Sequence, residues 1–507
     1  MATVTLTQAP LPSNSSTSSA PSPPRKKRAN SRQQAWHDGT DKQQGRAKSR
    51  KPRAGGVKKD PPPLIRKVGL AAQIYGIQGV MGTVVWFQGW REWLYPPNGG
   101  PDIVKAYECR PGMGVRPPMR NSIFFPKSFD LTSPQTLPTI LMVHGGGFCV
   151  GTSRDDDEWN RRVADSQNML VISLPYSKAP RAPFPAGLND LEALYLAVLA
   201  DESLPIDRTS TASRSKGRNG RVGGGGRKRG RVALAGFDAG ANLALALSQL
   251  PAVQKSAAPP TAVVSISGIL DLSRPLEAKA RGRPYKPGLP HPRNGAADVL
   301  AATYSAYAWS YVPYGEDLRD PLLSPAFAGW DGDNGGEGEG EGALPPHVCL
   351  VGAELDLLAH ESWRMACRLV QEGGIRRGDG RRARWRVPDP DAAEDKTQSV
   401  CGREQLSAVK GSLEMEDLSL SAREDEDGLG GRKRFGFEVT WSSGDDDRGG
   451  GEEDGSVRWI LVPDVMHGFD RSLWRYGGEE TVRDAELKTV AYVDAVGKWL
   501  RDTVWKI

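Results

Sequence analysis

Short runs of apolar residues recur along the chain, separated by longer stretches with helical spacing. A strand that is covered on both faces shows no polar alternation, so each run predicts a buried strand. The runs lie at 138–143, 169–174, 231–235, 262–266, 348–351 and 457–462, and the first strands are expected within 102–129. Helical stretches lie at 158–168, 183–198, 240–250, 362–371 and 482–499. Strands that alternate with helices predict an α/β fold with a mostly parallel central sheet flanked by helices.

One apolar segment stands outside this pattern. Residues 68–90 carry no charge and are flanked by Arg66-Lys67 and Arg91-Glu92, a length that suits a membrane span. Five glycines and three glutamines within this segment make its insertion into lipid costly. We therefore expect an apolar helical segment over 64–100, which is either a cap, an interfacial helix on a membrane surface or a true span.

Several segments have the composition of low-complexity chain. Residues 1–63 form a basic, Ser/Pro-rich tail that we expect to be disordered. Further inserts are expected at about 208–230, 332–343 and 374–456, within a domain over 101–507. The tail lacks the apolar core of a secretory signal. We therefore expect a protein that is intracellular, either cytoplasmic or membrane-associated, and not secreted.

The composition and the cysteine spacing argue against a cofactor, a metal site and a nucleic acid partner. With 59 glycines, 39 prolines and 38% hydrophobic residues in 507, much of the chain is not core. The five cysteines show no C-x-x-C spacing, and the sequence has no phosphate loop, metal cluster or nucleotide fingerprint. We therefore predict no cofactor and no metal. The net charge of +6 is small for this length, and no nucleic acid partner is expected, while the oligomeric state stays open.

The strand at 138–143 ends in a glycine run, His144-Gly145-Gly146-Gly147. Glycines free the backbone to turn its N–H groups toward one point, which is what a developing oxyanion requires. A flexible loop is the simpler alternative. The position directly after a core strand favours an oxyanion hole.

A sharp turn, Gly236-Phe237-Asp238-Ala239-Gly240, joins the strand at 231–235 to an apolar helix. Glycines on both sides of Asp238 allow a tight turn that exposes its side chain above the sheet in strained backbone geometry. This pattern is that of a nucleophile elbow with an aspartate at its tip. The alternative is an ordinary strand-to-helix turn with a capping Asp.

A carboxylate and a histidine follow two later strands. Asp356 comes after the strand at 348–351, with Glu354 as a weaker candidate, and His467 comes after the strand at 457–462. We expect Asp238, Asp356 and His467 to form one site. Their order along the chain is nucleophile, acid, base.

These motifs resemble those of the hormone-sensitive-lipase-like esterases and lipases, the fold-3 group of the α/β-hydrolases. The matching patterns are HGGGF at 144–148, Tyr176 with Ala179-Pro180 and PFP at 183–185, Asp356 with Glu361, and HGF at 467–469. The resemblance covers roughly residues 100–505 apart from the inserts. It implies an α/β-hydrolase fold with a cap, and a small apolar ester-like substrate. It also implies an oxyanion hole near Gly145, Gly146 and Ala239.

The chain departs from that group at the elbow, where the group has serine and this sequence has Asp238. Attack of a carboxylate on an ester carbonyl gives an anhydride, whereas attack on a saturated carbon gives an alkyl ester that His467 can hydrolyse through a water molecule. This logic resembles that of the haloalkane dehalogenases and epoxide hydrolases. Epoxide opening also needs a proton donor. The predicted cap at 274–320 offers aromatic residues to line the site, namely Tyr285, Tyr304, Tyr307, Trp309 and Tyr311.

Three functions remain open on the sequence. The first is a hydrolase with an Asp238-His467-Asp356 site that acts on a small apolar ester-like or epoxide-like substrate. The second is a catalytically inactive protein of the same fold that binds a small ligand or a partner. The third is a membrane-tethered interaction protein, which the apolar segment and the basic tail favour.

Overall fold

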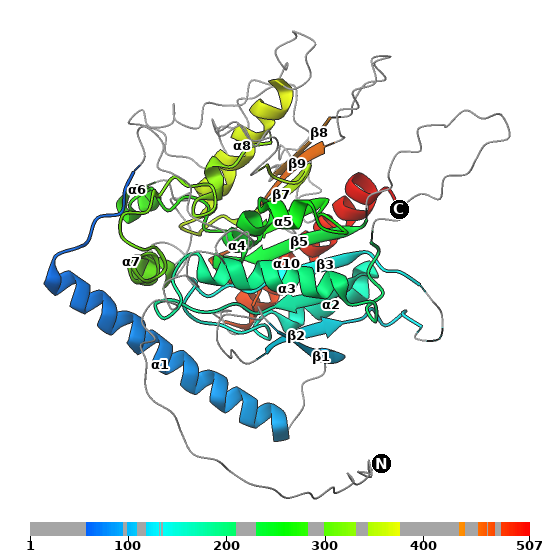
Figure 1. Cartoon of the computed structure of the whole chain (residues 1–507), viewed down its shortest axis with the longest axis horizontal. Coiled ribbons are helices and arrows are strands. Elements are labelled where there is room, and N and C mark those ends of the chain that lie inside the picture. The colour runs from blue at the N-terminus through cyan, green and yellow to red at the C-terminus, as the bar shows by residue number, and fades with distance from the viewer. Residues whose placement is uncertain are drawn as a thin grey trace, which may run out of the picture. The chain divides into compact units, whose positions relative to one another are not determined.

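A nine-stranded sheet forms the centre of the computed structural model (Figure 1). The structure describes residues 57–94, 99–108, 118–130, 132, 135–208, 230–281, 299–330, 343–375, 436–441, 455–463, 465–471 and 478–507. The predicted tail before residue 57 and most of the three predicted inserts lie outside these residues.

The strand order across the sheet is β1-β2-β4-β3-β5-β6-β7-β9-β8. The bounds are β1 Ile103–Tyr107, β2 Met119–Phe124, β3 Thr139–Val143, β4 Leu170–Leu174, β5 Val232–Phe237, β6 Ala262–Ile266, β7 His347–Ala353, β8 Gly436–Trp441 and β9 Gly455–Val462. All neighbours from β4 to β9 are parallel, and β1, β2 and β8 pair antiparallel at the two edges. The prediction of a mostly parallel α/β sheet is confirmed.

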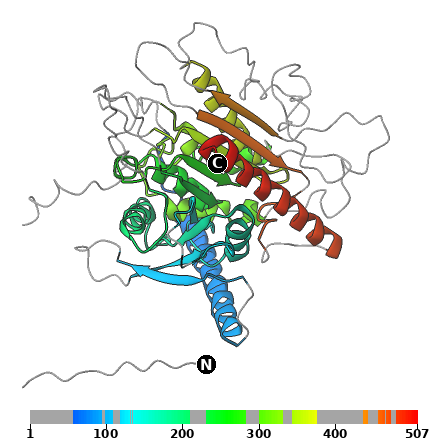
Figure 2. The ribbon, with the colours of Figure 1, turned by 90° about the vertical axis from the view of Figure 1, so that its right-hand side faces the viewer.

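Helices cover both faces of this sheet. The bounds are α1 Leu64–Leu94, α2 Asp157–Gln167, α3 Ala186–Ala200, α4 Ala239–Ser248, α5 Pro251–Gln254, α6 Leu276–Arg281, α7 Val299–Tyr311, α8 Ala359–Ile375 and α10 Glu479–Trp499. Alternate side chains of β3 enter opposite cores, because successive residues of a strand point to opposite faces. Leu141 and Val143 belong to the core cluster that includes residues of α3, α4 and α8, whereas Ile140 and Met142 belong to the cluster that includes residues of α2 and α10. Figure 2 shows helices on both sides of the sheet.

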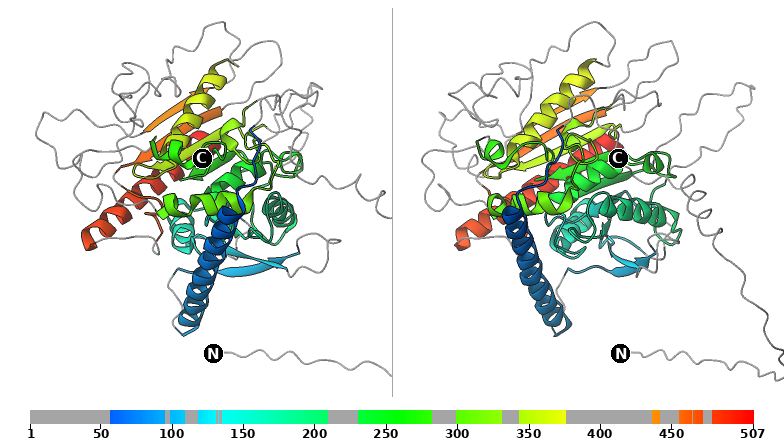
Figure 3. Two further views of the ribbon diagram at one scale, coloured as in Figure 1. Left: turned by 90° about the vertical axis from the view of Figure 1, so that its left-hand side faces the viewer. Right: turned by 60° about the vertical axis from the view of Figure 1, so that its left-hand side comes forward.

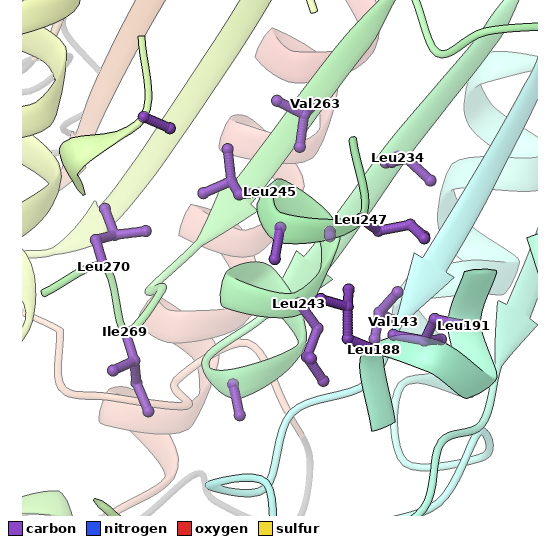
Figure 4. Close-up of a cluster of buried hydrophobic side chains, with 14 of the residues drawn as sticks. Val143, Leu188, Leu191, Leu234, Leu243, Leu245, Leu247, Val263, Ile269 and Leu270 are labelled. Atoms are coloured by element: carbon purple, nitrogen blue, oxygen red, sulfur yellow. The ribbon is translucent and has the colours of Figure 1, made fainter. Parts of the chain in front are cut away.

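Helix α4 is the most deeply placed helix, since every one of its residues is buried. Figure 4 shows Leu243, Leu245 and Leu247 of α4 among side chains of α3, β5 and β6. A helix that is apolar on all sides is stable only when it is enclosed. The start of α4, where the elbow lies, is therefore held firmly against the sheet.

Helices α6 and α7 form a cap, and α1 lies beside α7 (Figure 3). The residues before α1 were predicted to be part of a disordered tail, but residues 57–63 are placed against the cap. The Lys59 ammonium donates to the carbonyl oxygens of Ala308 (3.1 Å) and Trp309 (2.7 Å), and to that of Val312. The carbonyls at the end of a helix lack intrahelical donors, so a lysine there satisfies them.

The predicted insert at 374–456 also needs correction, because it contains the edge strand β8. Val439 is buried and pairs with Val457, and the Glu438 carboxylate accepts a hydrogen bond of 2.7 Å from the Thr503 hydroxyl. The alternation in GFEVTW at 436–441 is typical of a half-covered edge strand. Charged and glycine-rich neighbours in the sequence hide this short signal.

Gly240 allows the close approach of α4 to β3, and this packing can be tested. A Cβ atom at Gly240 would collide with the carbonyl groups of Val143 and His144, whereas a Cβ at Gly79 in α1 would meet nothing. We expect Gly240→Ala to lower the free energy of unfolding by about 2 kcal/mol or more. Gly79→Ala should be neutral or stabilising by up to about 1 kcal/mol. Urea unfolding measures both, and equal midpoints for Gly240→Ala and wild type would contradict this account.

Candidate active site

Asp238 occupies the tip of the turn between β5 and α4. Its backbone angles are φ 50° and ψ −114°, a strained conformation for a residue that has a side chain. The Asp238 amide donates to the Ile266 carbonyl (2.9 Å), and the Asp238 carbonyl accepts from the Ile269 amide (3.2 Å). The elbow predicted from the two glycines is thus present, and neighbouring strand ends hold it in place.

The Asp238 carboxylate lies against the glycine run. Its Oδ2 accepts hydrogen bonds from the amides of Gly146 (3.0 Å) and Gly147 (2.8 Å). Both glycines have positive φ, of 110° and 57°, which turns their N–H groups to the same side. One carboxylate oxygen therefore sits where a substrate oxyanion would be bound.

Of the residues predicted to lie near the oxyanion hole, namely Gly145, Gly146 and Ala239, Gly146 donates its amide to the Asp238 carboxylate, and Gly147 does so as well. Among the described residues, the amide bonds to the Asp238 carboxylate come from Gly146 and Gly147. Which amides take part depends on the backbone angles at Gly146 and Gly147, which the sequence pattern does not specify.

His467 lies between two carboxylates. Its Nδ1 is 2.9 Å from Oδ2 of Asp356, and its Nε2 is 3.9 Å from Oδ1 of Asp238. Asp356 is fully buried, and its Oδ1 accepts a hydrogen bond from the Leu358 amide at 3.1 Å. Asp356, the acid preferred on the sequence over Glu354, therefore orients the imidazole. The predicted Asp238, Asp356 and His467 meet at one edge of the sheet.

The other carboxylate oxygen of Asp238 has a different environment. Oδ1 is buried and makes no hydrogen bond within the described part of the chain. It faces His467 at a distance too long for a hydrogen bond. The two oxygens of Asp238 are thus distinguished, one fixed by amides and the other without a donor.

A partly buried lysine, Lys178, supports the glycine run and was not among the residues predicted from the sequence. Lys178 Nζ donates to His144 Nε2 (2.8 Å), so His144 Nδ1 carries the proton and donates to the Gly145 carbonyl (2.7 Å). Burial, and then the Lys178 charge, hold the pKa of His144 well below its usual value. Burial lowers the pKa of Lys178 to about 7. The one feature of the sequence that could have indicated a role for Lys178 is its place between Tyr176 and Ala179 in the matched motif.

A partly buried arginine lies behind the same loop. Arg471 Nε forms an ion pair with Oδ1 of Asp156 at 3.0 Å, and its guanidinium lies 4.6 Å from the centre of the Phe237 ring. Burial raises the pKa of Asp156 to about 7 even though Arg471 opposes the shift. A Cβ atom on Gly145 would come within 2.5 Å of the Arg471 guanidinium. Arg471 follows the HGF motif but shows no pattern that marks it in the sequence.

Two cap tyrosines of α7 lie near Asp238. The ring of Tyr307 would collide with any Cβ on Gly147, and the hydroxyl of Tyr304 is buried with no hydrogen-bond partner among the described residues. Burial, and then nearby carboxylates that include Asp238, raise the pKa of both. Tyr311 stacks on Phe148 at 3.7 Å, and Trp309 donates to the Tyr314 hydroxyl. Tyr285 lies outside the described residues.

Glu361 of the matched motif connects the cap to the sheet. Its Oε2 accepts hydrogen bonds from the amides of Leu270 (2.9 Å) and Asp271 (3.0 Å), and its other oxygen pairs with the buried Lys279 of α6. Lys279 Nζ also donates to the Asp271 carbonyl at 2.6 Å. A buried pair with these additional bonds fixes the position of α6 relative to β6.

Comparison with known proteins identifies the fold of the chain. Residues 140–376 match a family model described as alpha/beta hydrolase fold. The chain has the α/β-hydrolase fold. An acetyl-hydrolase of Streptomyces hygroscopicus is 30% identical over 219 residues, which are 43% of this chain and 56% of that protein. The hormone-sensitive lipase of Bos taurus is 29% identical over 102 residues, 18% of this chain and 13% of its own.

The α/β-hydrolase domain also aligns with a solved esterase from Pyrobaculum calidifontis. The TM-score is 0.49 at 17% identity, over 87% of this chain and 99% of that one. The chain spans just over half the length of the acetyl-hydrolase. The resemblance to the hormone-sensitive-lipase-like group is confirmed by the family model and the sequence relatives.

Replacing Lys178 tests the support of the glycine run in this α/β-hydrolase domain. The folded pKa of Lys178 is about 7, against 10.5 for an ordinary lysine, so the unfolded chain binds more protons between these pH values. The free energy of unfolding should therefore rise with pH across this window. In Lys178→Met we expect this rise to be smaller by up to about 1.4 kcal/mol per pH unit. Urea unfolding between pH 7 and 10 measures the slope.

Lys127→Met is the matched control, since the Lys127 side chain is 80% exposed. That variant should keep the slope of the wild type. A slope in Lys178→Met equal to that of the wild type would contradict the argument.

Proposed function

We propose that this chain is a hydrolase in which the Asp238 carboxylate attacks a saturated carbon atom of a small apolar substrate, an epoxide being the substrate class that fits best. The single observation that carries the proposal is the asymmetry of Asp238. Its Oδ2 is held by the amides of Gly146 and Gly147, while Oδ1 is buried, has no donor and faces His467. A carboxylate held in this way has one oxygen that no hydrogen-bond donor of the described residues occupies, and we assign the attack to that oxygen.

The same geometry argues against the usual acyl chemistry of the fold. In a serine esterase the substrate carbonyl oxygen enters the amide pair and becomes the oxyanion. Here Oδ2 of Asp238 already accepts both N–H groups. An ester carbonyl would have to displace a carboxylate oxygen from its two donors, and the product of attack would be an anhydride.

In the first step, Oδ1 of Asp238 forms a bond to an epoxide carbon while that carbon's bond to the ring oxygen breaks. The ring oxygen takes a proton from the hydroxyl of a cap tyrosine. Tyr304 and Tyr307 are the two candidates, because both feel the Asp238 charge and Tyr304 has no competing acceptor among the described residues. The product of this step is an alkyl ester on Asp238.

In the second step, Nε2 of His467 takes a proton from water, and the resulting hydroxide attacks Cγ of Asp238. The electron pair moves to Oδ2, where the amides of Gly146 and Gly147 stabilise it. The bond between Cγ and Oδ1 then breaks, and the leaving alkoxide takes the proton from His467. The remaining proton of the new carboxyl group returns to the tyrosinate, which restores the site. Asp356 orients the imidazole throughout.

Names of relatives support a hydrolase in general terms. The relatives described above are named an acetyl-hydrolase and a hormone-sensitive lipase, and both names are those of hydrolases. The substrate class proposed here rests on Asp238 and not on those names.

A second candidate is an inactive hydrolase-fold protein that binds a small ligand or a partner. One observation favours it, namely that the chain's own carboxylate fills the amide pair and lies 3.9 Å from His467, so that no hydrogen bond links nucleophile and base. The absence of turnover in the experiments below would favour this candidate.

Isotope labelling tests the aspartate nucleophile. With enzyme in excess over styrene oxide in ¹⁸O-water, the first turnover should place the label in the peptide that contains Asp238, and the diol should carry unlabelled oxygen. His467→Gln should accumulate the alkyl-enzyme, visible as a mass increase equal to one substrate. Label that appears in the diol during the first turnover would show direct attack by water and exclude the covalent mechanism.

Replacing Asp238 with serine tests the explanation of the filled amide pair. Asp238→Ser vacates the pair and supplies a hydroxyl beside His467, so we expect hydrolysis of p-nitrophenyl acetate to rise at least about 100-fold over the wild type. Asp238→Ala vacates the pair without supplying a nucleophile and is the matched control. Equal rates in the serine and alanine variants would show that the rest of the site cannot support acyl transfer.

A further inference from the structure

We propose that α1 binds the interface of an anionic lipid membrane through its solvent-exposed apolar face. In this arrangement the helix lies along the membrane surface, beside the loops that build the candidate active site. The binding itself does not depend on the chemistry of Asp238.

Helix α1 has two faces of different character. One face docks on the domain through the buried Ile74 and the partly buried Leu70, Ile77 and Met81, at helical spacing. Gln73 adds a hydrogen bond of 2.8 Å from its amide to the Ala302 carbonyl of α7. These contacts fix α1 to the cap along one stripe only.

The opposite face is apolar and exposed. Its large side chains are Ile65 (89% exposed), Val68 (61%), Val80 (65%), Trp86 (71%), Phe87 (55%) and Trp90 (51%). No charge interrupts the chain from 68 to 90. A helix that is apolar on its outer face as well as on its docked face needs a second apolar partner. An exposed apolar patch of this kind marks an interaction site.

Length, aromatic content and charge identify a lipid surface as that partner. Among the described residues, α1 is the one helix long and apolar enough to cross a membrane, and only 6% of its apolar window is buried. Trp86, Phe87 and Trp90 gather near one end, where amphipathic rings suit the headgroup region. Arg66 and Lys67 lie at the other end, and residues 1–63 hold thirteen Lys and Arg against three Asp. Basic charge beside an apolar helix favours anionic lipids.

The contacts of α1 with the domain indicate whether the helix lies on the membrane or crosses it. A spanning helix would need lipid on all sides, but Ile74 is fully buried against the domain. Only the outer face is free, so the helix enters the interface sideways with its exposed rings and aliphatic chains in the acyl boundary.

The docked side of α1 contacts loops next to the candidate site. The Gln78 side-chain amide donates to the Cys149 carbonyl (2.9 Å), next to the glycine run, and to the Ala179 carbonyl (2.8 Å), next to Lys178. Helix α1 thus connects a lipid surface on its outer face with the loop after β3 and with the loop that carries Lys178. If the proposed function holds, apolar substrates dissolved in the membrane reach the enzyme at this point.

The test is sedimentation of the full chain with vesicles of phosphatidylcholine alone and of phosphatidylcholine mixed with phosphatidylserine. We expect the wild type to sediment with the anionic vesicles and to be released by salt. The double variant Trp86→Glu and Trp90→Glu should bind at least about tenfold more weakly. The matched control places glutamate at Leu196 and Leu487, which are exposed on α3 and α10, and should bind like the wild type. Circular dichroism verifies that each variant is folded.

Several outcomes would overturn the proposal. Wild-type protein that stays in solution with both kinds of vesicle, or equal binding by the wild type and the tryptophan variant, would exclude α1 as the membrane contact. Quenching of Trp86 fluorescence by lipids brominated near the bilayer centre would indicate a span. A dimer in solution that the tryptophan variant dissociates would assign the exposed face to a second copy of the chain. None of these readouts depends on turnover, so they are independent of the proposed chemistry.

Discussion

The two hydrogen bonds from Gly146 and Gly147 to the Asp238 carboxylate determine what the site can do. They join the loop after β3 to the elbow after β5, across neighbouring parallel strands. A buried charge is tolerated only when donors are fixed around it. His144 and Lys178 hold the glycine run, and the close approach of α4 holds the elbow. Together they keep the two amide donors in place beside Asp238.

The motifs that sequence analysis located are those that directly follow buried strands. His144, Asp238, Asp356 and His467 each lie just beyond a strand of the parallel sheet, and the carboxyl ends of such strands converge at one edge. Their proximity follows from connectivity alone. The same argument cannot say which amides face Asp238, because that depends on the backbone angles of Gly146 and Gly147.

Other contributors could not be found in this way. Lys178 and Lys279 are held by partners that tertiary packing supplies, and lysine is an ordinary surface residue in sequence statistics. The edge strand β8 has a single alternating hexapeptide among charged and glycine-rich neighbours, so its signal was lost. Residues 57–63 dock on α7 because Lys59 donates to carbonyl groups at the end of that helix. The amino-acid composition of the segment does not reveal such a contact.

Strand β8 completes one edge of the sheet, although 60 residues of chain, 376–435, separate it from α8 in the sequence. The entropic cost of closing a loop grows with the logarithm of its length, by only about 0.6 kcal/mol for each doubling. Additional residues between α8 and β8 therefore change the free energy of folding very little, whereas the residues around Asp238 are fixed by hydrogen bonds and packing. A whole foreign domain grafted between α8 and β8 would leave the geometry around Asp238 unchanged, so a sensor or a localisation module can be added there without redesign of the sheet.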